Sequence, residues 1–373
     1  MKIAIIKETA SGETRVAATP DTVKKLVALE HTLILQSGSG VVAGYTDDAF
    51  KEAGANMAAT AKAALNGADV LFKVRAPSAA EIKTLPEGLT VIALMDPFAL
   101  DPAPLNAAKI TTLSMEFTPR ISRAQSMDAL SSQSNLAGYR AVIEGAGIYG
   151  RAMPMMMTAA GTVAPAKVFV MGAGVAGLQA IATARRLGAV VSATDVRPAA
   201  KEQVASLGAK FIAVEDEEFK AAETAGGYAK QMSPEYQAKQ AELVAAHIAK
   251  QDIVITTALI PGRAAPVLVT ADMVAAMRPG SVIVDMAVSQ GGNCPLSEPD
   301  VIVDSGGVKV AGFTNLPAHL PADSSALYAK NLLAFLPLIT AEDGSLNLDT
   351  DDEIVTAMIL TRGGKTVNER LKG

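Results

Sequence analysis

The sequence predicts an α/β protein with two domains, each built on a doubly wound parallel sheet. At 373 residues, the chain is longer than a single hydrophobic core usually serves. Half of the residues are apolar and only 4% are aromatic, as in proteins whose parallel strands are buried on both faces. Short apolar runs alternate with helix-period segments along most of the chain, which is the pattern of repeated βα units.

Composition excludes several functional classes. The net charge of −5 provides no basic footprint, so nucleic acid is not an expected partner. The single cysteine, Cys294, excludes an internal disulfide framework and is typical of a reducing compartment. The opening MKIAIIKE reads as a strand rather than a signal peptide, and no stretch reaches the roughly 20 clean apolar residues of a membrane span. We therefore expect a soluble protein that could dock onto a membrane partner.

The first domain is predicted from five βα repeats. Strands are expected at residues 2–7, 32–36, 69–74, 90–94 and 110–115. Helices are expected at about 21–30, 47–53, 60–65, 79–85 and 102–108. Pro20 and Asp21 are start signals for the first helix, and Pro77 and Ser78 open the fourth. No glycine fingerprint occurs in this domain, so no motif predicts its chemistry.

Residues 119–140, PRISRAQSMDALSSQSNLAGYR, break the repeat. A helix is expected from about Met127 to Tyr149, leading into the second domain. The polar side chains at its entry include Arg120, Arg123, Gln125, Asp128, Ser131, Ser132 and Gln133. They are either capping groups of that helix or a polar segment that faces a ligand. The methionine-rich run at 153–157 is expected to pack in a core, where flexible side chains fill gaps.

The second domain opens with the most informative stretch, residues 166–197. The apolar run 168–171 predicts a buried parallel strand. Gly172, Gly174 and Gly177 follow at G-x-G-x-x-G spacing and open a helix-period segment that continues to Leu187. The first glycine permits a tight turn, the second lets backbone approach a pyrophosphate, and the third lets the helix pack close to the sheet. The helix N-terminus then supplies free N–H groups for the anion.

A second apolar run, 189–193, ends at Asp195, about 20 residues after the glycines, where a dinucleotide fold places the acid that binds the adenosine ribose. Its charge would repel a 2′-phosphate, so we expect a preference for NAD over NADP. The alternative is a tight turn in an ordinary α/β domain. Strand, glycines, helix, strand and acid in this order favour the dinucleotide site of a Rossmann-like fold.

The remaining elements complete the second domain and return to the first. Strands are expected at 210–214, 253–256, 282–285 and 308–312, and helices at 201–207, 239–249 and 271–277. Residues 215–238 are charged and weakly periodic, which predicts a functional loop. Tyr228 in it is either a lid residue or an exposed loop side chain. A helix at 321–336 returns to the first domain, so we assign residues 1–131 and 319–373 to one domain and 132–318 to the other.

The sequence supplies no evident group for proton transfer. His31, His247 and His319 do not follow strands, so we expect each of them to be structural. One cysteine and scattered histidines do not form a metal site, and no phosphate loop or Ser-His-Asp pattern occurs. We therefore predict a nucleotide site with neither a metal nor a catalytic side chain.

Five motifs together resemble the NAD(H)-binding domain of the proton-translocating NAD(P) transhydrogenases. They are RISRAQSMDALSSQSNLAGYRAV (120–142), the stretch 157–197, ETAGGYAKQM (223–232), ITTALIPGR (255–263) and VDMAVSQGGNCPLSEP (284–299). The resemblance begins at KETASGETRVAATP and extends almost to the end of the chain. It implies direct hydride transfer between NADH here and NADP⁺ on a partner domain, coupled to proton translocation by a membrane domain. No substrate proton is then moved by this chain.

The same family includes alanine dehydrogenase, the first alternative. The substrate-carboxylate ligand of that enzyme is retained as Arg15. The enzyme's substrate lysine is replaced by Arg75, its catalytic histidine by the segment Met95-Asp96-Pro97, and its catalytic aspartate by Ser289. These departures argue against oxidative deamination.

The resemblance also assigns cofactor-binding residues and partners. The nicotinamide pocket would include Arg120, Gln125, Ser126, Met127, Asp128 and Ser131. The rest of the site would include Gly172, Gly174, Val175, Gly177, Asp195, Val196, Arg197, Met232, Gln240 and Leu259, with Gly227 and Tyr228 on a mobile loop. The chain would be a homodimer at the cytoplasmic face of the inner membrane, held there by membrane-spanning subunits. A third hypothesis is a non-catalytic NAD-binding regulator, although such a sensor has less need of the polar segment.

Overall fold

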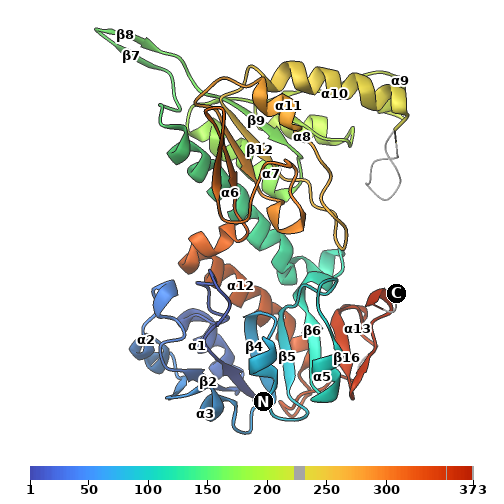
Figure 1. Cartoon of the computed structure of the whole chain (residues 1–373). Coiled ribbons are helices and arrows are strands. Elements are labelled where there is room, and N and C mark those ends of the chain that lie inside the picture. The colour runs from blue at the N-terminus through green and yellow to red at the C-terminus, as the bar shows by residue number, and fades with distance from the viewer. Residues whose placement is uncertain (222–231, 350, 372–373) are drawn as a thin grey trace. The chain divides into compact units, whose positions relative to one another are not determined.

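The computed structural model describes residues 1–221, 232–349 and 351–371, and the chain divides into two compact units (Figure 1). The first unit comprises Met1–Gln133 and Pro317–Gly373, and the second comprises Ser134–Leu316. The chain leaves the first unit within helix α6 (Ala129–Tyr149) and returns within the short 3₁₀ helix η5 (Leu316–His319). The second unit is thus an insertion in the first.

The first unit contains an eight-stranded sheet of order β17-β16-β6-β5-β4-β1-β2-β3. Its strands are β1 (Lys2–Ile5), β2 (Thr32–Gln36), β3 (Asn56–Ala58), β4 (Val70–Arg75), β5 (Thr90–Leu94), β6 (Thr111–Ser114), β16 (Ile359–Arg362) and β17 (Lys365–Thr366). The first six are parallel; the βα repeats predicted five of them, and the short edge strand β3 was not predicted. The two C-terminal strands add an antiparallel edge.

Helices cover both faces of this sheet. They are α1 (Pro20–Ala28), α2 (Asp47–Glu52), α3 (Ala61–Leu65), α4 (Ala79–Ile82), α5 (Ala103–Ala107), α12 (Pro321–Phe335) and α13 (Glu353–Met358), with 3₁₀ helices η1 (Val41–Ala43), η2 (Met115–Phe117), η3 (Ser122–Met127), η6 (Leu336–Ile339) and η7 (Glu369–Leu371). One core contains side chains of α1, α2, α12 and α13, and the other contains side chains of α3, α4 and α5. Thr19 and Ser78 cap α1 and α4 through capping boxes; Ser78 was a predicted start signal, whereas the cap at Thr19, next to the predicted Pro20, was not.

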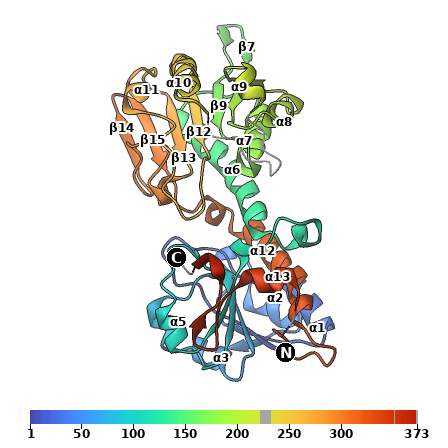
Figure 2. The ribbon, with the colours of Figure 1, turned by 90° about the vertical axis from the view of Figure 1, so that its right-hand side faces the viewer.

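The second unit contains a seven-stranded sheet of order β11-β10-β9-β12-β13-β15-β14 (Figure 2). Its strands are β9 (Lys167–Met171), β10 (Val190–Thr194), β11 (Lys210–Phe211), β12 (Ile253–Thr256), β13 (Val282–Asp285), β14 (Ile302–Ser305) and β15 (Val308–Gly312). All pairs are parallel except the edge pair β14–β15. The expected doubly wound fold is confirmed, with an antiparallel edge strand in each unit.

Alternating side chains on each strand of the second sheet enter opposite cores. Val168 and Val170 pack with α6, α7 and α8, whereas Phe169 and Met171 pack with α10 and α11. The helices of this unit are α7 (Val175–Arg186), α8 (Ala200–Ser206), α9 (Glu217–Lys220), α10 (Pro234–Ile248) and α11 (Ala271–Ala275), with the 3₁₀ helix η4 (Val288–Gln290). The continuous apolar run of β9 is therefore explained by burial on both faces.

Three local expectations were wrong. The methionine-rich run does not pack as a whole: Met153 is buried, but Met155 and Met157 are 59% and 78% exposed, and Met156–Thr158 (β7) pairs with Gly161–Val163 (β8) in a hairpin. Helix α10 starts at Pro234 rather than at 239, because Ser233 caps it and Pro234 suits the first turn. The strand expected at 210–214 is only two residues long.

Candidate functional site

The glycine turn after β9 has the geometry that its sequence predicts. Gly172 has a φ of +107°, which an L-residue with a side chain rarely adopts. A β-carbon on Gly177 would lie 1.8 Å from the carbonyl oxygen of Gly172, so only glycine lets α7 start this close to the strand. The strand therefore leads directly into the helix.

The N-terminus of α7 has unused hydrogen-bonding capacity. Gly174 is its N-cap residue and provides no side-chain cap, so it satisfies none of the N–H groups of the first turn. No atom lies within 4 Å of the position of a β-carbon on Gly174, so the backbone there borders open space. A twelve-residue helix with such a start suits a phosphate group, because its N–H groups and dipole both favour an anion.

Asp195 follows β10, the strand next to β9, and its carboxylate is nearly buried. It accepts hydrogen bonds from the backbone N–H groups of Ala173 (2.7 Å) and Arg197 (2.8 Å). The guanidinium of Arg197 donates two more, at 2.9 and 3.0 Å. Burial alone would raise the pKa of Asp195, but these hydrogen bonds outweigh it and lower the pKa below its ordinary value. The group is therefore an anion at neutral pH.

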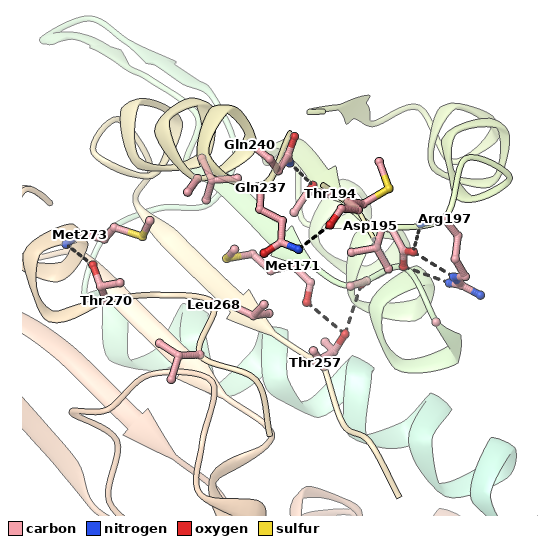
Figure 3. A pocket seen from close by; sticks show the side chains of 18 of the residues that line it. Met171, Thr194, Asp195, Arg197, Gln237, Gln240, Thr257, Leu268, Thr270 and Met273 are labelled. Atoms are coloured by element: carbon pink, nitrogen blue, oxygen red, sulfur yellow. Dashed lines mark hydrogen bonds and ion pairs between the residues drawn. The ribbon is translucent and has the colours of Figure 1, made fainter. Parts of the chain in front are cut away.

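A cavity of about 560 Å³ opens at the carboxyl ends of β9, β10 and β12 (Figure 3). Its lining residues are Met171, Gly172, Gly174, Thr194, Asp195, Val196, Arg197, Met232, Tyr236, Gln237, Gln240, Ala241, Val244, Thr257, Ala258, Leu259, Val267, Leu268, Thr270 and Met273. The position is the switch point of the sheet, between β9 and β12, where α/β sheets bind ligands. A volume of this size fits a nucleotide-sized ligand.

The opposite wall of the cavity is the irregular segment 257–270, and two residues that the sequence analysis missed hold it. Asn293 is fully buried; its side chain accepts from Ala258 N (3.1 Å) and donates to the carbonyls of Ala258 (2.9 Å) and Pro266 (2.8 Å). Its own carbonyl accepts from the N–H groups of Leu268 and Val269. With its amide nitrogen turned to the same segment, Gln290 donates to the carbonyls of Ile260 and Arg263. We call Gln290 and Asn293 the amide clasp.

Asp285, at the end of β13, fixes the turn that presents the amide clasp. Its fully buried carboxylate accepts from Thr256 Oγ1, Ala287 N, Cys294 N and Ser297 Oγ. Gly291 and Gly292 between the two clasp residues both have positive φ values. The order Gln-Gly-Gly-Asn was thus a signal for the amide clasp in the sequence. A turn that needs two glycines places the two flanking amide side chains on one loop.

The structure brings most of the predicted residues of the second unit together. Gly172, Gly174, Asp195, Val196, Arg197, Met232, Gln240 and Leu259 line the cavity. Val175 and Gly177 lie in the first turn of α7 and are not among the lining residues. Gly227 and Tyr228 lie outside the described residues. Gln240 holds the cavity wall by accepting from Val214 N and donating to Thr194 Oγ1.

The polar segment 120–131 lies in the first unit, where some of its residues have structural partners. Asp128 accepts from the N–H and the hydroxyl of Ser131 at the start of α6, which is a capping arrangement. Met127 is buried in the core, so its side chain is not available to a ligand there. Arg120, Gln125 and Ser126 are exposed. Capping therefore accounts for Asp128 and Ser131, and a ligand-facing role of Arg120, Gln125 and Ser126 stays a prediction.

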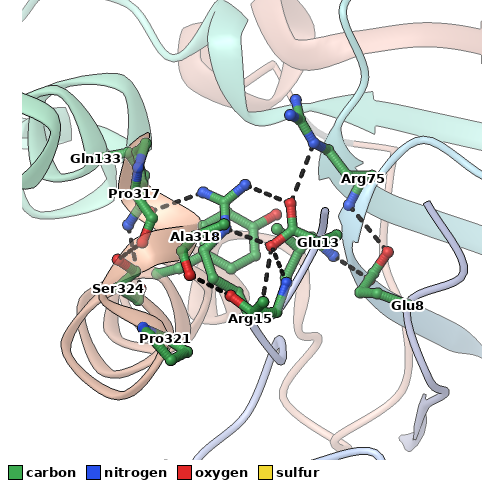
Figure 4. Close-up of polar contacts among 12 residues, drawn as sticks. Glu8, Glu13, Arg15, Arg75, Gln133, Pro317, Ala318, Pro321 and Ser324 are labelled. Atoms are coloured by element: carbon green, nitrogen blue, oxygen red, sulfur yellow. Dashed lines mark hydrogen bonds and ion pairs between the residues drawn. The ribbon is translucent and has the colours of Figure 1, made fainter. Parts of the chain in front are cut away.

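A cluster of charged side chains, buried except for Arg75, lies where β1 and β4 end (Figure 4). The carboxylate of Glu13, fully buried, receives the guanidinium groups of Arg15 (2.6 Å) and Arg75 (3.2 Å). Arg15 also donates to Gln133 Oε1 at 2.8 Å. Lys73 is buried between Glu8 and Glu81, at 3.1 and 2.9 Å. The guanidinium retained from the alanine dehydrogenase pattern thus already holds an internal carboxylate.

No metal-binding group of three or more His, Cys, Asp or Glu side chains occurs among the described residues. His247 contacts Ser192 Oγ at 2.8 Å and packs edge-on against Phe169, as expected of a structural histidine. Within residues 1–221, 232–349 and 351–371, no helix has the length and apolar character needed to cross a membrane.

Comparisons with known proteins cover the whole chain. The model of the Alanine dehydrogenase/PNT N-terminal domain matches residues 4–137, and that of the C-terminal domain matches residues 141–369. The first portion of the NAD(P) transhydrogenase alpha subunit of Rhodospirillum rubrum is 57% identical over 381 residues, which cover 100% of this chain and 99% of that protein.

Two solved structures have the same fold. The crystal structure of transhydrogenase from Sinorhizobium meliloti has a TM-score of 0.90 and 54% identity, and it covers 98% of this chain and 100% of its own. An L-alanine dehydrogenase has a TM-score of 0.85 at 25% identity, covering 100% of this chain and 98% of its own. Similarity is therefore higher on the transhydrogenase side.

Proposed function

This chain belongs to the alanine dehydrogenase/PNT family, and we propose that it is the NAD(H)-binding component of a proton-translocating NAD(P) transhydrogenase. The observation that carries the proposal is the 57% identity, over the full chain, to a transhydrogenase alpha subunit. The cavity at the switch point of the second unit supports it, because the start of α7 suits the pyrophosphate of NAD(H) and Asp195 suits the adenosine ribose.

The fit of NAD(H) to this cavity rests on three groups. The uncapped first turn of α7, beside Gly174, would bind the pyrophosphate. Asp195 would accept hydrogen bonds from the adenosine ribose, and Leu259 would flank the adenine or ribose. The apolar side chains of Val267, Leu268 and Met273 leave the remaining wall suited to a flat ring.

The proposed reaction explains why no proton-transfer residue is evident. When NADH is bound, it supplies a hydride that leaves C4 of its ring and joins C4 of NADP⁺ on the partner domain. The residues of this chain then bind, orient and exclude water rather than move a proton. Arg120, Gln125 and Asp128 are proposed to orient the nicotinamide end. The same proposal covers Gly227 and Tyr228, which lie outside the described residues.

The partners are proposed as a set. An NADP-binding domain on another polypeptide would accept the hydride, and membrane-spanning subunits would conduct the proton and hold this chain at the cytoplasmic face of the inner membrane. We also propose a homodimer. The β7–β8 hairpin supports it, since Met155, Met156 and Met157 expose apolar surface that a second copy could cover. Replacing the three by serine should shift the sedimentation coefficient to that of a monomer, whereas an unchanged coefficient would exclude the hairpin from the dimer interface.

Stopped-flow hydride transfer tests the function directly. The protein with NADH is mixed with an isolated NADP-binding domain carrying NADP⁺. Fast, stoichiometric transfer that requires both proteins supports the proposal. Oxidation of NADH by pyruvate and ammonia would instead indicate alanine dehydrogenase, and NADH binding without either reaction would indicate a regulator.

One variant separates orientation from binding. Gln125 is exposed, so its substitution by alanine should not disturb the core. Gln125→Ala should slow transfer far more than it weakens NADH binding, because orientation of the ring affects the transition state more than the ground state. Equal losses in the two measurements would reduce Gln125 to a binding role.

A further inference from the structure

The carboxylate of Asp195 has all of its hydrogen-bonding positions filled by the protein itself. A carboxylate offers about four lone-pair sites, two on each oxygen. Oδ1 accepts from the N–H and Nε of Arg197, and Oδ2 accepts from the N–H of Ala173 and Nη2 of Arg197. The two hydroxyls of a nucleotide ribose therefore require positions that are already taken.

The four donors differ in how easily they can leave. The N–H groups of Ala173 and Arg197 belong to the backbone of the glycine turn and of the segment after β10, so they stay with the fold. The guanidinium is the end of a flexible side chain that is 36% exposed and already borders the cavity. Water or a bound nucleotide can take over the hydrogen bonds between the guanidinium and Asp195. The guanidinium is therefore the donor that a ribose can displace.

We propose that Arg197 occupies the ribose position of the cavity and sets its selectivity between nucleotides with and without a 2′-phosphate. The inference rests on the proposed function, since it takes Asp195 as the ribose-binding acid. A nucleotide with a free 2′-hydroxyl exchanges two guanidinium hydrogen bonds for two hydroxyl ones. The bidentate pairing holds the guanidinium on Asp195 and away from any phosphate.

The same pair explains the exclusion of a 2′-phosphate. A phosphate at the 2′-position would meet the negative charge of Asp195, while the adjacent guanidinium of Arg197 is held by that acid. Guanidinium groups bind phosphate in a bidentate manner, and an arginine is the usual partner of a 2′-phosphate in dinucleotide folds. Without Asp195, Arg197 is a phosphate ligand at the right place. Asp195 thus both repels a nucleotide with a 2′-phosphate and keeps Arg197 from binding that phosphate.

Two ligands that lack the nicotinamide test this proposal by calorimetric titration: 5′-AMP, and adenosine 2′,5′-bisphosphate, which adds only the 2′-phosphate. The variants are Asp195→Ser, Arg197→Leu and the double variant. Arg186→Leu is the matched control, because it removes the same charge from the exposed end of α7. Thermal unfolding of each variant accompanies the titrations.

We expect wild-type protein to prefer 5′-AMP, and Asp195→Ser to prefer the bisphosphate by about tenfold, the equivalent of one charge-assisted hydrogen bond. The double variant should lose that preference. Arg197→Leu should bind 5′-AMP more tightly than wild type, since no guanidinium competes with the ribose, and Arg186→Leu should match wild type.

Three outcomes would overturn the proposal. If Asp195→Ser gains nothing for the bisphosphate, Arg197 is not a latent phosphate ligand. If Arg197→Leu weakens binding of 5′-AMP, the guanidinium assists the nucleotide rather than competing with it. If the wild-type protein binds neither ligand, the proposed function fails as well. This outcome differs from the first two, in which the wild-type protein binds 5′-AMP.

Discussion

The six parallel strands of each sheet follow the same order, β3-β2-β1-β4-β5-β6 in the first unit and β11-β10-β9-β12-β13-β15 in the second. Each sheet therefore has a switch point, between β1 and β4 or between β9 and β12. In the second unit, the strand ends there border a cavity of about 560 Å³. In the first unit, the charge cluster of Glu8, Glu13, Arg15, Lys73 and Arg75 occupies the corresponding strand ends.

The two units differ in how the backbone N–H groups at these strand ends are hydrogen-bonded. Glu8 accepts from the N–H of Val74 and Glu116 accepts from those of Met95 and Asp96, so acidic side chains cap the strand ends of the first unit. In the second unit, Asp195 and Asp285 also accept from N–H groups after β9 and β13, but the start of α7 at Gly174 has no side-chain cap and leaves N–H groups for a ligand. One topology can thus place either a cavity or a cluster of paired charges at its switch point, depending on a few residues after each strand.

The largest effect is expected at the glycine turn. In Gly177→Ala, the new β-carbon would lie 1.8 Å from the Gly172 carbonyl oxygen, so α7 must shift away from β9. Such a displacement should weaken NADH binding by about 100-fold or more in calorimetric titration. Gly147→Ala is the control: it adds a β-carbon to open space in α6, and it should retain affinity and gain up to about 1 kcal/mol in free energy of unfolding. Wild-type affinity in Gly177→Ala would show that the turn is not the binding element.

The next effect concerns the charge cluster at the switch point of the first unit. Glu13→Gln leaves the guanidinium groups of Arg15 and Arg75 without their buried carboxylate. Loss of one partner from a buried pair should lower the free energy of unfolding by about 3–5 kcal/mol, measured by urea denaturation. Affinity for 5′-AMP should not change, because the cavity lies in the other unit. Glu87→Gln, which breaks the exposed pair with Lys109, should leave stability nearly unchanged. Equal stabilities of the two variants would contradict the distinction between a buried cluster and a surface pair.

A smaller effect is expected at the amide clasp. Asn293→Ala removes three side-chain hydrogen bonds to Ala258 and Pro266, so the wall 257–270 loses its fixed shape. We expect about tenfold weaker binding of 5′-AMP. Ser281→Ala also removes a buried hydrogen bond from this unit, to the carbonyl of Gln251, but at the other end of β13. It should lower stability without weakening binding, and equal binding losses in both variants would mean that the clasp has no specific role.

The smallest effect is a difference in pH dependence between the units. Burial is the main influence on Glu8 and raises its pKa above 4.5, so its contribution to stability falls as pH rises from 4.5 through the raised value. Asp195 has a pKa below its ordinary 3.8, so its contribution is present above 3.8 and is lost as pH falls through the lowered value. In urea denaturation across pH, Glu8→Gln should remove the first slope and Asp195→Asn the second. Slopes of the same sign would contradict this assignment.

Local signals in the sequence predicted the fold and the glycine side of the cavity. Strands β12, β13 and β15 have the expected limits, because buried parallel strands are continuous apolar runs. The role of Gly172 was predictable since a single residue type permits its positive φ.

Longer-range features were not predictable. The wall 257–270 has no periodicity, and Asn293, 35 residues beyond Ala258, determines its shape. The exposed methionines were misassigned to a core because hydrophobicity alone does not distinguish burial within a chain from an exposed apolar surface. The pairing of the Arg197 guanidinium with the Asp195 carboxylate depends on the side-chain rotamer of Arg197, which the sequence does not specify.

The insertion of one unit in the other has a consequence for biosynthesis. Thr112 of β6 and Thr361 of β16 share a hydrogen bond across 249 positions of the chain. A ribosome therefore finishes the whole inserted unit before it makes the strand that covers β6. During that interval the edge of β6 has an open hydrogen-bonding row, which is a hazard for aggregation. We expect the inserted unit to fold first on the nascent chain, and chaperone dependence to be greatest while β16 is still being synthesised.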